Sequence, residues 1–224
     1  MPRVGVLVLA AGRSSRFGTA GAHKLLAMVD GVPLVRLAVA AAVDADVGEV
    51  VVVTGAHGVP IQRALDGLSV RIVHEPNFAN GMAVSLRCGV AALGRDADAV
   101  LIGLGDQPDM RPEAYRRVTS RWQTSRLSIV VPRYADWTAP AHPTLFAADV
   151  FPELLALDGD VGARAVVARD PARVAEAPLE WAAPRDVDTI EDLESLCDSR
   201  VLVTGPAPRH TGSAGPPPPR KPIQ

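Results

Sequence analysis

The hydrophobic residues gather in short continuous runs that alternate with helical patterns. The first run, VGVLVLA at Val4–Ala10, is rich in β-branched residues and is soon followed by Gly12, which is typical of a strand buried on both faces of a sheet. Similar runs occupy residues 49–54, 70–73, 99–104 and 128–131. Helical patterns lie between the runs, at residues 33–45, 60–65, 82–93 and 112–123. The alternation predicts a three-layer α/β fold with a mostly parallel central sheet.

The pattern loosens after residue 132. We expect a short strand at residues 144–146, helices near residues 150–157 and 161–168, a last strand near residues 185–187 and a final helix at residues 190–197. Thr189 would cap that helix, with Glu191 and Asp192 in its first turn. Residues 205–224 are rich in proline and glycine. The sequence therefore predicts one domain over residues 1–204 and a disordered tail at residues 205–224.

Composition narrows the class of protein. The chain has 224 residues, 48% of them hydrophobic, which is enough for a core without disulfides or structural metals. Its 23 Lys+Arg against 25 Asp+Glu give no basic surface for nucleic acid. Cys88 and Cys197 form no Cys-x-x-Cys pair, so neither a zinc knuckle nor a disulfide framework is indicated. No signal peptide or membrane span is recognisable, and we expect a cytoplasmic protein.

The loop after the first run carries the strongest candidate chemistry. In open α/β sheets, ligands bind beyond the carboxyl ends of the strands. This loop reads LAAGRSSRFG at residues 9–18, so small residues would let backbone amides approach a ligand, and Arg13, Arg16 and Lys24 would supply cations. Such a loop suits a triphosphate. The alternative is an ordinary strand-to-helix turn in an arginine-rich chain, since the pattern is neither a Walker A motif nor Gly-x-Gly-x-x-Gly.

Two acidic loops suggest a divalent cation. Asp106 follows the strand expected at residues 99–104, in Gly105-Asp106-Gln107-Pro108, where it could hold Mg²⁺ or simply cap its own turn. In Asp186-Val187-Asp188-Thr189, alternation sends Asp186 and Asp188 to the same side of an extended segment. Only one of these two need bind a metal. The other reading of the segment is a helix cap beside a solvated charge.

These motifs together resemble the MobA-like nucleotidyltransferases. The resemblance is carried by LAAGRSSRFG with Lys24-Leu25-Leu26, by Gly81-Met82-x-x-Ser85-Leu86, by Gly105-Asp106-Gln107-Pro108, by His142-Pro143, by Gly159-Asp160-x-Gly162-Ala163 and by Asp186-Val187-Asp188-Thr189. The matching motifs occur in the same order from residue 4 to about residue 196. Within the family, the chain is most similar to the molybdenum cofactor cytidylyltransferases. The resemblance implies a Rossmann-like, GT-A-like nucleotidyltransferase fold. The implied reaction transfers CMP from CTP to the phosphate of molybdenum-bound molybdopterin and releases pyrophosphate.

The resemblance also implies roles for individual residues. Those expected to bind the nucleotide are Leu9, Ala10, Ala11, Gly12, Arg13, Lys24, Gly81, Ser85 and Asp106. Lys24, Arg13 and Asp106 would carry catalysis, Asp106 and Asp188 would hold Mg²⁺, and the loop at His142 and Pro143 would border the second substrate. The implied partners are CTP, a molybdopterin-type substrate and a recipient molybdoenzyme or its chaperone. Neither nucleic acid nor a membrane is expected.

The nucleotide can be narrowed further by resemblance. Guanylyl members typically have Leu-Ala-Gly-Gly in the first loop, whereas this chain has Leu-Ala-Ala-Gly, with Ala11 in place of the first glycine. Cytidylyl relatives place a base-contacting serine where Ser85 stands. Both features favour CTP over GTP. Two positions depart from the relatives. Ala141 replaces the usual glycine before His142, and Glu75 stands where asparagine is frequent, which would add negative charge near an anionic site.

Two other functions remain open at this point. One is an NAD(P)H-dependent oxidoreductase of the nicotine blue oxidoreductase type, on the same fold. The first loop lacks the dinucleotide fingerprint, however, and the acidic residues would be idle in a reductase. The other is a non-catalytic nucleotide-binding or chaperone module. The joint presence of Lys24, Asp106 and Asp188 argues against lost catalysis.

Overall fold

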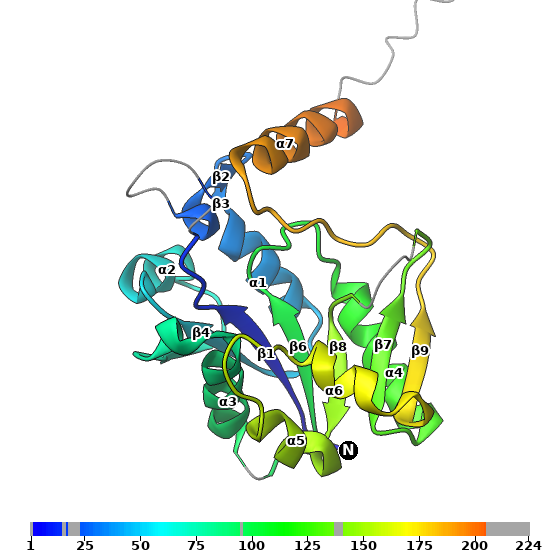
Figure 1. The fold of residues 1–224 in the computed structure, drawn as a ribbon. Coiled ribbons are helices and arrows are strands. Elements are labelled where there is room, and N and C mark those ends of the chain that lie inside the picture. The colour runs from blue at the N-terminus through cyan, green and yellow to red at the C-terminus, as the bar shows by residue number, and fades with distance from the viewer. Residues whose placement is uncertain (1, 15–16, 18–22, 95, 137–140, 205–224) are drawn as a thin grey trace, which may run out of the picture.

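A seven-stranded sheet forms the centre of the molecule. The computed structural model describes residues 2–204 except 15–16, 18–22, 95 and 137–140, and the side chains of residues 201–204 are not described. The strand order is β5-β4-β1-β6-β8-β7-β9 (Figure 1). A separate two-stranded ribbon is formed by β2 and β3.

The strands are β1 (Val4–Ala10), β2 (Met28–Val29), β3 (Val32–Pro33), β4 (Gly48–Thr54), β5 (Arg71–His74), β6 (Ala99–Leu104), β7 (Ile129–Arg133), β8 (Thr144–Ala147) and β9 (Val174–Pro178). The α-helices are α1 (Leu34–Asp44), α2 (Gly58–Ala64), α3 (Met82–Leu93), α4 (Pro112–Ser125), α5 (Phe151–Leu155), α6 (Arg164–Arg169) and α7 (Ile190–Thr204). Short 3-10 helices lie at Lys24–Leu26, Phe78–Asn80, Ala148–Val150 and Pro171–Arg173.

The predicted mostly parallel sheet is confirmed. Strand β1 lies between β4 and β6 and runs parallel to both, and β5 continues the parallel order beyond β4. Strand β8 is antiparallel to its neighbours β6 and β7, whereas β9 runs parallel to β7. Because β1 and β6 are parallel neighbours, the loops that follow them leave the same edge of the sheet. That edge holds the candidate site.

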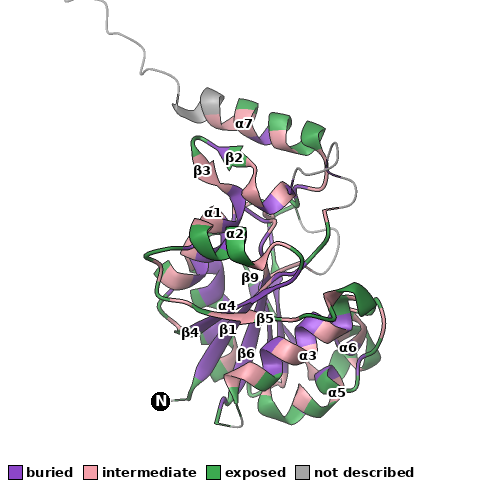
Figure 2. Ribbon diagram, turned by 90° about the vertical axis from the view of Figure 1, so that its left-hand side faces the viewer, coloured by how far each residue is buried: buried purple, intermediate pink, exposed green. Residues whose placement is uncertain are grey.

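The three layers follow from the alternation of side chains along the strands. Val4, Val6 and Val8 of β1 point into the cluster that contains residues of α1, α2 and α4, while Leu7 points into the cluster of α3, α5 and α6. Figure 1 shows α3, α5 and α6 in front of the sheet, and Figure 2 shows the buried strands between the helices. Both faces of the sheet are covered, which explains why β1 is apolar throughout.

The prediction of a strand at residues 185–187 is wrong. This segment is an extended loop outside the sheet, joined to the core by the hydrogen bond from Val187 N to Asp106 O at 3.0 Å. The last strand is instead β9, which the sequence reading missed. Its inward residues are Ala175 and Ala177, whose small side chains give a weak hydrophobic signal.

The N-cap predicted for the final helix is confirmed. Thr189 Oγ1 accepts from Asp192 N at 3.1 Å, and Asp192 Oδ2 accepts from Thr189 N at 2.8 Å, which is a capping box with aspartate in the usual glutamate position. The helix continues to Thr204, farther than predicted. The tail predicted to be disordered lies outside the described residues. Among those that are described, no helix is long and apolar enough to cross a membrane.

Candidate active site

A cavity of about 750 Å³ opens at the carboxyl ends of β1 and β6. The residues around it are Leu9, Ala10, Ala11, Gly12, Arg13, Ser14, Lys24, Leu25, Phe78, Ala79, Asn80, Gly81, Met82, Ser85, Leu104, Asp106, Asp160, Asp186 and Asp188. Every residue that the sequence assigns to nucleotide or metal binding is among them. The loop at His142 and Pro143 is not. The cavity thus gathers residues that are far apart in the chain, as the parallel β1 and β6 dictate.

Lys24 joins the two carboxylates that were predicted to bind a metal. Its Nζ lies 2.7 Å from Asp106 Oδ2 and 2.7 Å from Asp188 Oδ1. The side chain of Lys24 is 13% exposed, that of Asp106 21% and that of Asp188 46%. One partly buried cation therefore bridges two acids from distant segments, at charge-assisted hydrogen-bond distance.

The charges of this cluster are mutually stabilised. Burial alone would lower the pKa of Lys24, but the charges of Asp106 and Asp188 and their hydrogen bonds outweigh it, and the pKa is raised. The lysine is therefore cationic at neutral pH. Asp106 Oδ1 is buried and has no hydrogen-bond partner among the described residues, so this carboxylate can accept one further ligand.

Asp186 is a further acidic residue that faces the same cavity. Asp186 Oδ1 accepts from Nε2 of the buried Gln107 at 2.8 Å. Burial raises the pKa of Asp186, and the nearby charge of Asp106 raises it further. The prediction that Asp186 and Asp188 lie on one side of their segment is confirmed, because both line the cavity while Val187 between them is buried.

The loop after β1 is attached to the segment that carries Lys24. His23 Nε2 lies 3.1 Å from Gly12 O, and Lys24 N donates to Ser14 Oγ at 3.3 Å. The ring of His23 also contacts that of His57, with 4.2 Å between the centroids. These contacts fix the first loop beside Lys24. Arg16, named as a third cation, lies outside the described residues.

The first turn of α3 forms another wall of the cavity. Gly81 and the buried Ser85 lie there as predicted, and Met82 N donates to Asp160 Oδ1 at 3.3 Å. The sequence reading did not name Asp160 or Phe78 as site residues. Arg13 lies over the Phe78 ring, 5.8 Å from its centroid. The Gly159-Asp160 motif was a signal for Asp160, but its contact with α3 spans too many residues to be inferred from spacing.

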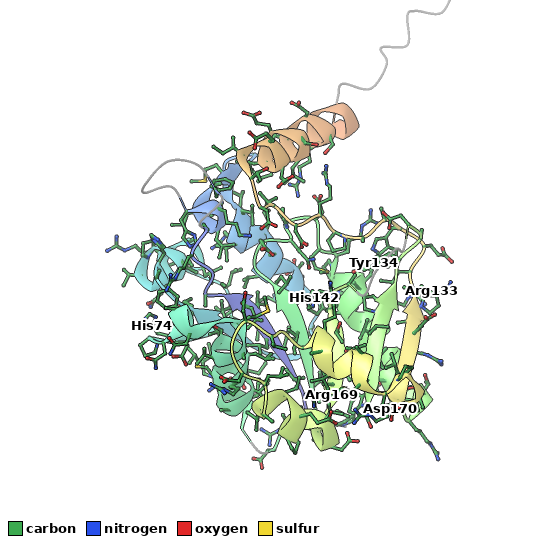
Figure 3. The ribbon with its side chains drawn as sticks, viewed as in Figure 1. His74, Arg133, Tyr134, His142, Arg169 and Asp170 are labelled. Carbon is green, nitrogen blue, oxygen red and sulfur yellow. The ribbon has the colours of Figure 1, made fainter. Side chains whose placement is uncertain are left out.

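His142 is partly buried and Pro143 is buried, and several contacts hold this loop in place. His142 Nδ1 lies 3.0 Å from Ile102 O, the His142 carbonyl accepts from Tyr134 Oη at 2.6 Å, and the His142–Pro143 peptide is cis. Figure 3 shows His142 and Tyr134 beside β6 and β7. Burial lowers the pKa of His142, which favours the neutral ring.

The two departures from the relatives lie outside the cavity lining. Ala141 O accepts from Thr144 Oγ1 at 3.0 Å, and Glu75 Oε1 accepts from Asn77 N at 2.7 Å. Glu75 also accepts a hydrogen bond from the Cys88 thiol. Burial is the main cause that raises the pKa of this thiol, and the carboxylate of Glu75 raises it further. Glu75 therefore stabilises its own turn, and its effect on the charge near the anion site stays a prediction.

The comparison with known families decides the class of this chain. Residues 6–174 match the MobA-like NTP transferase domain. The chain belongs to this family. It is a nucleotidyltransferase, and the match covers the strands and loops that form most of the cavity.

Solved structures agree with this assignment. Rv0371c from Mycobacterium tuberculosis H37Rv is 31% identical, with a TM-score of 0.74 over 88% of this chain and 98% of that one. A complex of Rv0371c with manganese from the same organism is 29% identical, with a TM-score of 0.72 and coverage of 88% and 98%. A nucleotidyl transferase from Methanothermobacter thermautotrophicus is 25% identical, with a TM-score of 0.73 and coverage of 90% and 99%. The nucleotidyltransferase fold predicted from the sequence is confirmed.

Proposed function

We propose that this chain transfers CMP from CTP to the phosphate of molybdenum-bound molybdopterin. One observation carries the proposal: a partly buried lysine joins two carboxylates at 2.7 Å in the wall of a cavity that is also lined by the loop Leu9 to Arg13. A triphosphate needs cations and a metal to neutralise its charge before another anion can attack it. The family and this cluster together support nucleotidyl transfer.

The residues present fit a divalent cation. Asp106 Oδ1 has no hydrogen-bond partner within the described ranges, Asp188 is half exposed, and hard cations prefer such oxygen ligands. The described residues contain no group of three or more acidic, histidine or cysteine ligands, so the nucleotide and water would complete the coordination. Asp106 and Asp188 would hold Mg²⁺, which would neutralise charge on the α-phosphate. The manganese complex of Rv0371c is in line with such a site in a relative.

The protein's own residues bind and orient the reactants. Lys24 and Arg13 would hold the phosphates, and the small residues Ala10, Ala11 and Gly12 would admit the nucleoside. An oxygen of the acceptor phosphate attacks the α-phosphorus of CTP, the bond to the β-phosphate bridge breaks, and pyrophosphate leaves. The acceptor already carries its nucleophile, so a catalytic serine, cysteine or histidine is not required.

CTP is the proposed nucleotide because Ala11 and Ser85 both lie in the cavity wall. The second substrate is assigned to the side of the cavity nearest His142 and Pro143. Because His142 is neutral and hydrogen-bonded to Ile102, its role would be to shape that side rather than to transfer a proton.

Mg²⁺-dependent turnover tests the proposal. Purified protein is mixed with CTP, Mg²⁺ and freshly prepared molybdenum-bound molybdopterin, and both pyrophosphate and the cytosine dinucleotide product are measured. Equal amounts of the two, dependent on Mg²⁺ and on the acceptor, are expected. Product formed from GTP instead of CTP would contradict the nucleotide assignment. NADPH oxidation without pyrophosphate would favour the oxidoreductase.

A further inference from the structure

We propose that Asp160 selects the base of the nucleotide by accepting a hydrogen bond from its amino group, so that cytidine is favoured over uridine. The inference rests on the proposed function, because it takes the cavity to be the site of a nucleoside triphosphate. Asp160 lines the cavity beside the first turn of α3, together with Gly81, Met82 and Ser85; this part of the lining is called the α3 wall.

The Asp160 loop is fixed against the first turn of α3. Gly159 O accepts from Ala83 N at 3.1 Å, and Asp160 Oδ1 accepts from Met82 N at 3.3 Å. Gly81 has φ 113°, and a Cβ at this position would lie 2.2 Å from Gly159 O. Glycine at position 81 is therefore needed for the close approach. Asp160 is exposed, but its carboxylate has a defined place in the wall.

This wall suits a base better than a phosphate. Free amides at a helix N-terminus attract phosphates, but the amides of Met82 and Ala83 are already hydrogen-bonded to the Asp160 loop. The negative charge of Asp160 would also repel an anion here. Lys24, in the 3-10 helix Lys24–Leu26, is instead paired with Asp106, which follows β6, and with Asp188. The phosphates are thus directed to Lys24, and the α3 wall is left for the nucleobase.

The chemistry of the pyrimidines then gives the selectivity. In the described part of the chain, Met82 N is the one hydrogen-bond partner of the Asp160 carboxylate, so its other oxygen can accept from a ligand. Cytosine presents an amino group at the position where uracil presents a carbonyl oxygen. A carboxylate accepts from the first and repels the second. A hydrogen bond to a charged group corresponds to roughly a tenfold preference or more.

The experiment is a calorimetric titration of CTP and UTP, each with Mg²⁺, into wild type, Asp160→Asn and a matched control, Asp158→Asn. The asparagine oxygen can still accept from Met82 N, while its amide N–H can donate to uracil. Asp158 lies two residues away, 92% exposed and outside the cavity lining, and pairs only loosely with Arg87 at 3.7 Å. Thermal unfolding of both variants checks that the fold is kept.

We expect wild type and Asp158→Asn to prefer CTP at least about tenfold, and Asp160→Asn to bind the two nucleotides within about threefold of each other. If Asp160→Asn keeps the full preference, or if wild type shows none, the role of Asp160 is overturned while the proposed transfer stands. If wild type binds no nucleoside triphosphate, the proposed function fails together with this inference.

Discussion

The ammonium group of Lys24 lies 2.7 Å from Asp106 Oδ2, an oxygen that a metal ion bound by this carboxylate could also use. The same lysine lies 2.7 Å from Asp188 Oδ1. Both carboxylates are proposed metal ligands, so Lys24 and a divalent cation would compete for them until a triphosphate drew the lysine away. Nucleotide and metal should therefore bind cooperatively.

The first prediction concerns metal binding without nucleotide. Lys24→Met should raise the affinity for Mn²⁺ at least about tenfold, because the competing ammonium cation is lost. The same variant should weaken CTP binding. Titration followed by electron paramagnetic resonance of free Mn²⁺ measures the first effect. Arg13→Met is the control, since it removes a cation from the same cavity that is bonded to neither acid. Equal or weaker Mn²⁺ binding by Lys24→Met would rule out competition.

The second prediction concerns Asp106. Asp106→Ala should fold normally and lower Mg²⁺-dependent turnover by at least about two orders of magnitude, as expected for loss of a charge-neutralising metal ligand. Turnover is measured as pyrophosphate release at saturating CTP. Asp66→Ala, at an exposed site outside the cavity, should match wild type. Unchanged turnover in Asp106→Ala would reject the metal assignment.

The third prediction concerns stability and pH. Burial lowers the pKa of His23, and the charges of His57 and Lys24 lower it further, so the folded protein holds this ring neutral. The unfolded chain takes up a proton near the ordinary pKa of about 6.5. The free energy of unfolding should therefore fall as the pH drops below about 6.5.

His23→Gln keeps a donor for Gly12 O and should show a smaller loss of stability between pH 7.5 and pH 5.5. Chemical unfolding at the two pH values measures it. His74→Gln, at an exposed histidine (Figure 3), should retain the wild-type dependence. Identical slopes for wild type and His23→Gln would show that His23 is not the group responsible.

The fourth prediction concerns the contact between Gly81 and Gly159. Gly81→Ala should lower the free energy of unfolding by about 2 kcal/mol or more, since it adds both backbone strain and a clash with Gly159 O. Gly67→Ala serves as control: its φ is also positive, at 83°, but a Cβ there meets nothing within 4 Å. If the two variants lose equal stability in thermal unfolding, the close approach contributes nothing.

The fold was largely predictable because most strands are buried on both faces. Continuous apolar runs such as Val4–Ala10 can hardly be anything else, and the parallel order then brings the loop after β1 and Asp106 to one edge. Strand β9 was not predicted, because its buried residues Ala175 and Ala177 are small and give a weak hydrophobic pattern. Residues 185–187 alternate like a strand, but the segment contacts the core through Asp106 O without joining the sheet.

The composition of the candidate site was also predictable, but its contacts were not. The sequence named Lys24, Asp106 and Asp188 individually. That one ammonium joins both acids depends on the path of segments more than 80 residues apart in the chain, as the separation of 82 between Lys24 and Asp106 illustrates. The place of Asp160 likewise depends on the approach of Gly159 to Gly81, which no local pattern reveals.

The most direct test of the central claim is a calorimetric titration of wild-type protein with CTP, GTP and NADPH, each with and without Mg²⁺. A cytidylyltransferase site in which metal and nucleotide bind together predicts CTP binding that requires Mg²⁺, little heat from GTP and none from NADPH. Binding of NADPH that is indifferent to Mg²⁺, with no response to CTP, would contradict it.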